Sequence, residues 1–360
     1  MAAPRHVAFL LPDLGGGGAQ KVMLTLAAHL DRERYAPQLL IVGGADTLSL
    51  PDGVPAERGN AARMVWGLPW LVRRIRRLRP NIVVSTLAYT NLALLAASPL
   101  LPSRTRIIVR EANMPSATLA AMPGWLRALG PYRLLYPRAT RIVAQTQAVA
   151  DALTVAAPGL RSSVRLLVNP VDIASTRATA LLPRREPGPG LRLVGAGRLT
   201  SQKGFDRLIE AAQGLPTNSR VTIFGDGTER RALDERIAAL GLGDRVRLAG
   251  YRAGLAPDLA GADALVMPSR WEGLPNVALE ALALGTPVIA TPECGLAEVA
   301  DRAGGAVRIA PFGDEFMALA GGVVADASRG EQLRPSLLPA EYGIEAVVAR
   351  FQNLLDECLA

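Results

Sequence analysis

The 360-residue chain has very little histidine and cysteine, with two residues of each. Cys294 and Cys358 lie in no metal-binding or redox spacing, which excludes a disulfide scaffold and fits a reducing compartment. His6 and His29 open a predicted strand and end a predicted helix, so we interpret both as structural or solvated and expect no metal site. No run approaches the roughly 20 apolar residues that cross a bilayer. The apolar run at residues 6–11 is too short for a signal peptide, so we expect a cytoplasmic protein.

Lysine is almost as scarce, because Lys21 and Lys203 are the only lysines among 40 basic residues. The arginine excess indicates a coding bias, so the net charge of +8 is weak support for a nucleic-acid partner, and no nucleic-acid motif accompanies it. The two lysines stand out against this background. A compact ammonium is a flexible point charge that suits phosphate, although chance placement remains open for Lys21.

Short apolar runs alternate with helical segments along the whole chain, which predicts an α/β protein with two doubly wound, mostly parallel sheets. A Pro/Gly stretch at residues 183–190 separates two series of runs and predicts a linker between a domain over residues 1–183 and a domain over residues 184–340. The predicted strands are His6–Leu11, Pro37–Val42, Asn81–Leu87, Arg106–Arg110, Arg141–Thr146 and Val164–Val168, then Leu191–Gly197, Arg220–Gly225, Arg245–Tyr251, Ala264–Pro268, Pro287–Thr291 and Ala306–Ala310.

The segment 269–287 carries two carboxylates around a predicted helix start. Pro275 suits the first helical position, so the helix is expected to begin near Leu274 and to stop at Gly285. The N–H groups of its first turn form an anion site, and Gly273 lets a ligand approach the backbone. Glu272 and Glu280 flank this site, where they suit hydroxyl groups better than phosphates. Solvated surface glutamates are the alternative.

Glycine-containing turns follow the first strand of each predicted domain. Gly15–Gly18 precede a helix and bring bare backbone toward a ligand, although a flexible tight turn explains them equally well. In the second domain, Gly197 is followed by Arg198 and Lys203, which would supply two cations to a diphosphate. Thr200 stands where a dinucleotide fold needs its third glycine, which argues against a nicotinamide cofactor.

The 269–287 segment resembles the motif of retaining glycosyltransferases of family 4, whose two glutamates are separated by seven residues, here Glu272 and Glu280. The resemblance extends over nearly the whole chain through Gly15–Gln20, Asn169–Asp172, and Gly197–Leu199 with Lys203–Gly204. It implies the GT-B fold, in which two Rossmann-like domains face each other across a cleft. The C-terminal helix, at residues 341–360, would cross back to the N-terminal domain.

The resemblance also implies roles for individual residues. Many members of the family carry a histidine after the fourth strand of the first domain, but this chain has Arg110-Glu111-Ala112-Asn113 there. Glu111 and Asn113 therefore become candidates for contact with the donor sugar or the acceptor. The implied catalytic residues are Glu272, Arg198 and Lys203, and the implied donor-binding residues are Gly17, Gly18, Gly273, Leu274, Pro275, Asn276, Glu280 and Tyr251.

The implied activity is the transfer of a sugar, without metal and with retained configuration, from a nucleoside-diphosphate sugar to a glycan or lipid-linked acceptor. Such transfer builds cell-surface polysaccharide or glycolipid, and a UDP-sugar is favoured over a GDP-sugar as donor. Two alternatives remain open at this point. One is a nucleotide-sugar epimerase on the same fold, and the other is a catalytically silent subunit that binds sugar nucleotides.

The acceptor side offers one further pattern. Arg58–Pro80 contains seven arginines and no acid, interleaved with apolar residues that include Trp66 and Trp70. This composition fits contact with an anionic membrane surface on the inner face of the cell membrane, and an ordinary amphipathic helix is the equal alternative. A second segment, Trp125–Arg138, would extend the membrane-facing surface.

Overall fold

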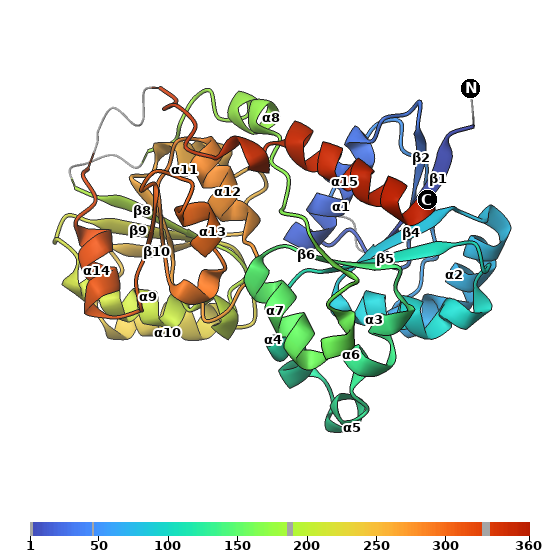
Figure 1. The fold of residues 1–360 in the computed structure, drawn as a ribbon. Coiled ribbons are helices and arrows are strands. Elements are labelled where there is room, and N and C mark those ends of the chain that lie inside the picture. Colours follow the sequence, from blue (N-terminus) through green and yellow to red (C-terminus); the bar gives the residue numbers. More distant parts are fainter. Residues whose placement is uncertain (1–2, 45–46, 186–189, 326–331) are drawn as a thin grey trace. The chain divides into compact units, whose positions relative to one another are not determined.

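A computed structural model describes residues 3–44, 47–185, 190–325 and 332–360 of the chain. The chain divides into two compact units. Unit 1 comprises Met1–Pro170 together with Glu345–Ala360, and unit 2 comprises Val171–Ile344. Figure 1 shows both units as parallel sheets covered by helices, which confirms the predicted α/β class.

Unit 1 is built on a seven-stranded sheet whose recorded strand pairs are all parallel. The central strands are buried on both faces, as parallel sheets with helices on both sides require. The strands, in spatial order, are β3 (Ala56–Arg58), β2 (Tyr35–Ile41), β1 (Arg5–Leu11), β4 (Ile82–Thr86), β5 (Arg106–Glu111), β6 (Arg141–Ala144) and β7 (Val164–Leu166).

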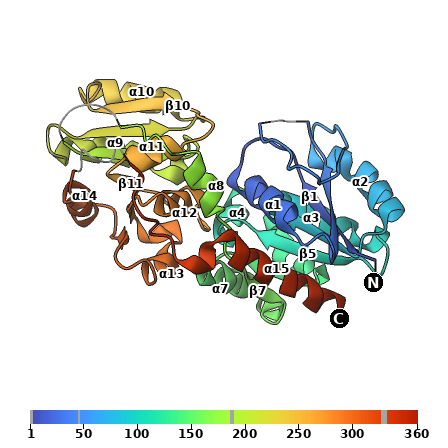
Figure 2. The same cartoon turned by 90° about the horizontal axis from the view of Figure 1, so that it is seen from above.

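Helices cover both faces of this sheet (Figures 1 and 2). Leu71 and Ile75 of α2 pack in one apolar cluster with residues of α3, α6 and α7. On the other face, Phe351 of α15 lies against Phe9 of β1, with ring centroids 6.1 Å apart. The helices of unit 1 are α1 (Gly18–His29), α2 (Met64–Leu78), α3 (Ala88–Ala97), α4 (Pro115–Ala121), α5 (Gly124–Ala128), α6 (Pro131–Leu134), α7 (Gln147–Ala156) and α15 (Ile344–Leu359).

Unit 2 repeats the plan with a six-stranded parallel sheet. Residues of α9, α10 and α14 share one apolar cluster on one face, and α11 and α12 lie on the other face (Figure 1). The strands, in spatial order, are β10 (Val246–Gly250), β9 (Arg220–Phe224), β8 (Arg192–Ala196), β11 (Ala264–Met267), β12 (Val288–Ala290) and β13 (Val307–Ile309). The helices are α8 (Ile173–Ala178), α9 (Phe205–Ala211), α10 (Arg230–Ala239), α11 (Ala256–Gly261), α12 (Asn276–Ala283), α13 (Ala297–Ala300) and α14 (Asp314–Gly321).

The division between the units falls after Pro170, earlier than the Pro/Gly stretch at residues 183–190 suggests. The reason is that the segment after Val171 already packs on unit 2. Arg177 of α8 donates hydrogen bonds to the carbonyl oxygens of Ala283 and Arg334. The two ends of unit 2 are also joined, because Val171 N–H donates to Tyr342 O and Ile344 N–H donates to Val171 O, at 2.9 and 3.0 Å. Residues 186–189 of the predicted linker lie outside the described residues.

Each of the twelve predicted strands is present, with ends that differ from the prediction by at most two residues. The sequence did not indicate β3, which has three half-buried residues at the edge of the sheet. The helix expected within Arg58–Pro80 is α2, and its buried residues Gly67, Leu71 and Ile75 are four apart. Within the described residues, no helix is both long and apolar enough to cross a bilayer.

Candidate functional site

The candidate site of unit 2 lies where the strand order of its sheet reverses. Strands β8 and β11 are neighbours in space although two strands and three helices separate them in the chain. Open α/β sheets bind ligands beyond the carboxyl ends of the strands at such a point. The segment after β8 carries Arg198 and Lys203, and the segment after β11 carries Glu272. The fold therefore brings three of the predicted residues to one edge of one sheet.

Lys203 and Glu272 form an ion pair across this point, between Nζ and Oε1. Both side chains are largely buried, with 14% and 10% of their surfaces exposed. Two further groups hold the carboxylate, since Ser269 Oγ donates to Oε1 at 3.2 Å and Gln202 Nε2 donates to Oε2 at 3.3 Å. Because a carboxylate that accepts several hydrogen bonds is fixed in direction, Glu272 presents a rigid acceptor to the space in front of it. The sequence did not indicate Ser269 or Gln202.

The loops that carry this pair are tied to one another. Arg270 binds the Asp206 carboxylate through both terminal nitrogens, at 2.8 and 2.6 Å, and these hydrogen bonds lower the pKa of Asp206. The Arg270 N–H also donates to Gln202 O at 2.7 Å. The stem of Lys203 lies over Gly197, where a Cβ atom would meet Lys203 Cε at 2.8 Å. A glycine is thus required beneath the lysine, at a φ of 156°.

Helix α12 begins at Asn276, so the predicted start near Leu274 is wrong by two residues. Pro275 is the N-cap with an extended ψ of 117° rather than the first helical residue, and its side chain caps no N–H group. Gly273 lies against the turn at Gly295, where a Cβ atom would meet Gly273 O at 1.9 Å. The helix has the predicted stop, because Gly285 follows it with a φ of 76°. Glu280, half-buried on α12, is one turn further from the pair than Asn276.

Arg198 and Tyr251 lie at the same sheet edge, after β8 and β10 respectively. Arg198 is exposed, and within the described ranges its guanidinium has no hydrogen-bond or ion-pair partner. Tyr251 is 59% exposed, so its ring is open to solvent. Both side chains are thus accessible to a ligand, as the predicted roles require. Neither contacts the Lys203–Glu272 pair through a recorded hydrogen bond.

The glycine loop of unit 1 is organised by an aspartate that the sequence did not indicate. Asp13 Oδ1 accepts hydrogen bonds from the Gly15 N–H at 2.8 Å and from Gln20 Nε2 at 3.1 Å. Gly17 is the N-cap of α1, and a Cβ atom there would meet Gln20 Oε1 at 2.3 Å. Gly18 is the exposed first residue of the helix. Bare backbone is therefore accessible at the carboxyl end of β1, as the sequence predicts.

Glu111, at the end of β5, points into the core of unit 1 and is 1% exposed. Its Oε2 accepts a short hydrogen bond from the Tyr136 hydroxyl. Burial raises the pKa of Glu111 to about 7, and hydrogen bonds from Tyr136 and Tyr132 and the charge of Arg110 partly oppose this rise. This placement does not support the expected contact between Glu111 and a sugar, because the side chain is enclosed by protein. Asn113, two residues later, is half-buried and caps its own segment through Met114 N–H at 2.9 Å.

Arg110, beside Glu111, is also buried, and burial lowers its pKa to about 10. Its guanidinium donates to Asn169 Oδ1 and to Thr86 Oγ1, the latter at 3.3 Å. Asn169 belongs to the Asn-Pro-Val-Asp segment that the sequence singled out. Its hydrogen bond to Arg110 places this asparagine in the core of unit 1. In the part of the chain that the structure describes, no group of three His, Cys, Asp or Glu side chains is placed to hold a metal ion.

Comparison with solved structures agrees with the fold. Crystal structures of the Anabaena protein HepE in complex with UDP and glucose have the same fold, with a TM-score of 0.74 and 17% identity over 98% of this chain and 100% of that chain. The outer-core galactosyltransferase WaaB in its apo form gives a TM-score of 0.66 with 15% identity, over 98% of this chain and 99% of that chain. The fold is therefore GT-B, as predicted.

The sequence comparisons define the family. Residues 16–175 match Glycosyltransferase Family 4, and residues 190–325 match Glycosyl transferases group 1. The chain belongs to the group 1, family 4 glycosyltransferases. The lipopolysaccharide core biosynthesis glycosyltransferase LpsE of Rhizobium meliloti (strain 1021) is 36% identical over 45% of this chain. The match spans about half of the length of LpsE (47%). The amylovoran biosynthesis glycosyltransferase AmsD of Erwinia amylovora is 24% identical over 94% of this chain and 96% of its own length.

Proposed function

We propose that the protein is a retaining glycosyltransferase that moves a sugar from a nucleoside-diphosphate sugar to a glycan or lipid-linked acceptor. The observation that carries this proposal is the Lys203–Glu272 ion pair at the point where the sheet of unit 2 reverses. These two residues come from the two separate motifs that resemble the family, and they meet in one buried pair.

In the proposed chemistry, the positive groups of the site bind the diphosphate and the carboxylates bind hydroxyl groups. Lys203 uses one N–H on Glu272, which leaves two donors for a diphosphate, and the exposed Arg198 adds a guanidinium. The N-terminus of α12 is a third positive element, because its first N–H groups and its dipole favour an anion. Together these groups would stabilise the charge that builds on the diphosphate as the glycosidic bond breaks. Glu272 and Glu280 would accept hydrogen bonds from sugar and ribose hydroxyls, since carboxylates beside phosphate oxygens would repel them.

We propose a UDP-sugar as the donor. HepE has been crystallised with UDP and with UDP-glucose, and it shares the GT-B fold over nearly the whole chain. Tyr251 and the adjacent backbone, after the edge strand β10, are the proposed wall of the base pocket. Gly17 and Gly18, after strand β1 of unit 1, are proposed to offer backbone N–H groups to a phosphate. The phosphate oxygens would accept the acceptor's proton, so the transfer needs no metal.

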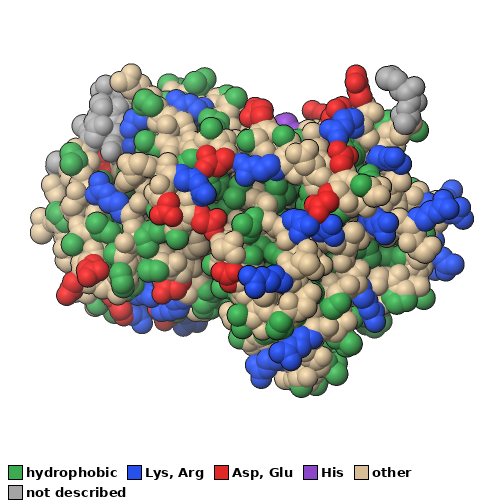
Figure 3. Space-filling model, viewed as in Figure 1, with side chains coloured by type: hydrophobic (Ala, Val, Ile, Leu, Met, Phe, Trp, Pro, Cys, Tyr) green, Lys and Arg blue, Asp and Glu red, His purple; other side chains and the backbone are tan. Residues whose placement is uncertain are grey.

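The acceptor side is proposed to lie on unit 1 and to face an anionic membrane on the cytoplasmic side. The relative LpsE is a lipopolysaccharide core biosynthesis glycosyltransferase, which supports an acceptor linked to lipid. Trp66 of α2 and Trp125 of α5 are 73% and 70% exposed, whereas Trp70 packs against Gly59. Helix α5 forms the tip of a protrusion in Figure 1, and Figure 3 shows basic side chains over it and over the region of α2. Exposed indoles beside arginines suit the headgroup region of a membrane.

The proposal is tested with Lys203→Ala and Glu272→Gln. Calorimetry with UDP measures binding, and UDP release from a panel of UDP-sugars, with and without a lipid-linked glycan acceptor, measures turnover. Removing one preorganised donor of this kind lowers turnover by about 10²–10³. We expect that loss for Lys203→Ala, and weaker donor binding together with slow turnover for Glu272→Gln. Arg231→Ala is the control, because this arginine of α10 is exposed and pairs only with Glu235 in the next turn.

The same measurements separate the alternatives. Full turnover in both site variants would contradict the proposal. A new sugar epimer without any acceptor would identify an epimerase, and UDP binding without turnover on any acceptor would identify a silent subunit. The anomeric configuration of the product, read by NMR, tests retention. Turnover that survives EDTA tests metal independence.

A further inference from the structure

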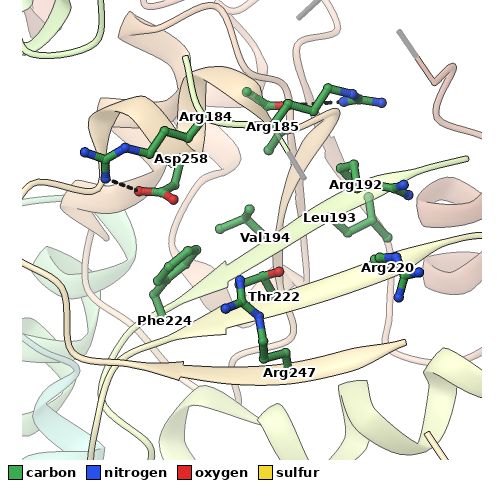
Figure 4. Close-up of a pocket in the computed structure, with 12 residues that line it drawn as sticks. Arg184, Arg185, Arg192, Leu193, Val194, Arg220, Thr222, Phe224, Arg247 and Asp258 are labelled. Atoms are coloured by element: carbon green, nitrogen blue, oxygen red, sulfur yellow. Dashed lines mark hydrogen bonds and ion pairs between the residues drawn. The ribbon is translucent and has the colours of Figure 1, made fainter. Parts of the chain in front are cut away.

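Unit 2 contains a positively charged pocket on one face of its sheet, and neither member of the Lys203–Glu272 pair lines it. It has a volume of about 230 Å³. Figure 4 shows the strands β8, β9 and β10 as its floor, with α11 and residues 184–185 above them. The charged side chains that line it are five arginines and one aspartate: Arg184, Arg185, Arg192, Arg220, Arg247 and Asp258.

The strand register explains how these charges gather. Arg192 of β8 is paired with Arg220 of β9, and Thr222 of β9 is paired with Arg247 of β10. Side chains at neighbouring register positions point to the same face of a sheet, so three guanidinium groups share this one. Like charges at directly opposed positions destabilise a sheet. Backbone carbonyl oxygens accept hydrogen bonds from two of these groups, because Arg192 Nη1 donates to Leu191 O and Asn218 O at 3.0 and 3.2 Å and Arg220 Nη1 donates to Asp244 O. An anion in the pocket would further offset the repulsion between them.

The opposite face of the same strands is apolar, as expected for a parallel sheet. Leu193, Val221 and Val246 alternate with the arginines and join the apolar cluster under α9 and α10. Parallel sheets in α/β folds carry apolar residues on both faces, because helices cover both. Here α11 has only six residues, so a part of the second face is left open and lined with charge. This departure from the expected pattern is confined to the three strands β8, β9 and β10.

The pocket is also held in shape by its own ion pairs. Arg185 binds Asp263 through both nitrogens, at 3.1 Å each, and Asp263 also accepts the Arg192 N–H at 2.8 Å. Asp258 pairs with Arg252 at 2.5 Å and with Arg184 at 3.6 Å. Asp263 and Asp258 are 0% and 9% exposed. The roof is therefore fixed by buried carboxylates, while Arg220 and Arg247 of the floor are exposed to an incoming ligand.

We propose that this pocket binds a small phosphate monoester of about the size of a sugar phosphate. Guanidinium groups match phosphate oxygens through paired hydrogen bonds, and the exposed Arg220 and Arg247 can supply them. Arg192 is buried and adds positive charge beneath them. The other end of the pocket is lined by Val194 and Phe224, which suit an organic group rather than a second phosphate (Figure 4). The volume equals about eight waters at roughly 30 Å³ each, which accommodates a phosphate and a monosaccharide. Neither Lys203 nor Glu272 lines this pocket, although its Phe224 is paired with Gly250, next to Tyr251.

The test uses the full chain with Lys203→Ala, so that phosphate binding at the proposed donor site is suppressed. Calorimetry with a hexose 6-phosphate, inorganic phosphate and the free hexose measures the affinity. We expect the hexose phosphate to bind more tightly than inorganic phosphate and the free hexose not to bind. In the double variant Arg220→Ala with Arg247→Ala, the affinity for the hexose phosphate should fall at least about tenfold for each charged hydrogen-bonding group lost.

The matched control removes two exposed arginines outside the pocket, Arg161→Ala with Arg231→Ala, and should retain the affinity. An unchanged melting temperature of the ligand-free variants shows that the fold is intact. Arg220→Lys with Arg247→Lys keeps the charge but loses the planar fork, and should bind with intermediate affinity. The proposal is overturned if the hexose phosphate does not bind, if the pocket variant binds it normally, or if the control loses binding to the same extent.

Discussion

The buried carboxyl group of Glu111 makes a sharp prediction about stability and pH. In unit 1, Glu111 is enclosed by Tyr132, Tyr136 and Arg110, and burial raises its pKa to about 7. The perturbation is Glu111→Gln, which keeps an acceptor oxygen for the Tyr136 hydroxyl but carries no ionisable proton. If burial of the charge is what raises this pKa, the variant loses a pH dependence that the parent protein has.

The magnitude follows from the two pKa values. The carboxyl group has a pKa of 4.5 when it is unperturbed and about 7 in the folded protein. Between these values the folded state keeps a proton that the unfolded chain has released, so the free energy of unfolding falls as the pH rises. The loss of unfolding free energy caused by burying the charged carboxylate is absent below pH 4.5 and complete above about pH 7. At about 1.4 kcal/mol per pH unit, the full cost is about 3 kcal/mol, and about 2 to 3 kcal/mol of it develops between pH 5 and 8.

The assay is urea unfolding at pH 5, 6, 7 and 8, read by hydrogen exchange of peptides from β4 and β5 so that unit 1 is followed separately from unit 2. The difference in unfolding free energy between Glu111→Gln and the parent should shift in favour of the variant by about 2 to 3 kcal/mol from pH 5 to pH 8. Glu33→Gln, at an exposed position of the same unit, should show no such shift. A constant difference across this pH range for Glu111→Gln would refute the reasoning, because the carboxyl group would then not titrate in the folded protein above pH 5.

Two further perturbations test other parts of the molecule. Gly225 has a φ of 137°, and a Cβ atom there would meet Gly197 O at 1.8 Å, so Gly225→Ala should destabilise unit 2 by about 1–3 kcal/mol in urea unfolding, whereas Gly243→Ala has open space and should be nearly neutral. Trp125→Ser should lower the affinity for anionic vesicles in flotation by about tenfold if α5 inserts its indole. The control Val155→Ser removes an exposed apolar side chain of α7, and equal losses in both variants would contradict a specific role for α5.

The sequence predicted the fold well because strands buried on both faces are mostly apolar. Runs such as Ala264–Pro268 contain no polar residue, so they stand out without any tertiary information. Strand β3 has the sequence Ala-Glu-Arg and is formed only because β2 offers it a free edge, which no local pattern reveals. The boundary between the two units after Pro170 could not be predicted either, because it depends on where α8 packs and not on composition.

The candidate site was predicted in part, for a related reason. The helix stop at Gly285 and the glycine turns follow from backbone preferences within a few residues, so the local sequence places them, whereas it placed the start of α12 two residues too early. Spacing gives no information about the partner of Lys203, because Glu272 is 69 residues away in the chain. The burial of Glu111 depends on Tyr132 and Tyr136 in a later segment, whose hydroxyl groups reach back to β5. An ionisable side chain next to a strand end therefore looks the same in the sequence whether it faces a ligand or the core.

The hydrogen bonds between Val171 and its partners Tyr342 and Ile344 have a practical consequence for protein engineering. They place the first and last residues of unit 2 side by side, so this unit has the connectivity of a cassette inserted into unit 1 between Pro170 and Glu345. Because its two ends are adjacent, unit 2 can be exchanged as one continuous segment. A related sequence whose ends are equally close would join to Pro170 and Glu345 without displacing either residue. Chimeras built at these junctions would transfer a whole second sheet, with the Lys203–Glu272 pair and the arginine-lined pocket, without interrupting the seven strands of the host.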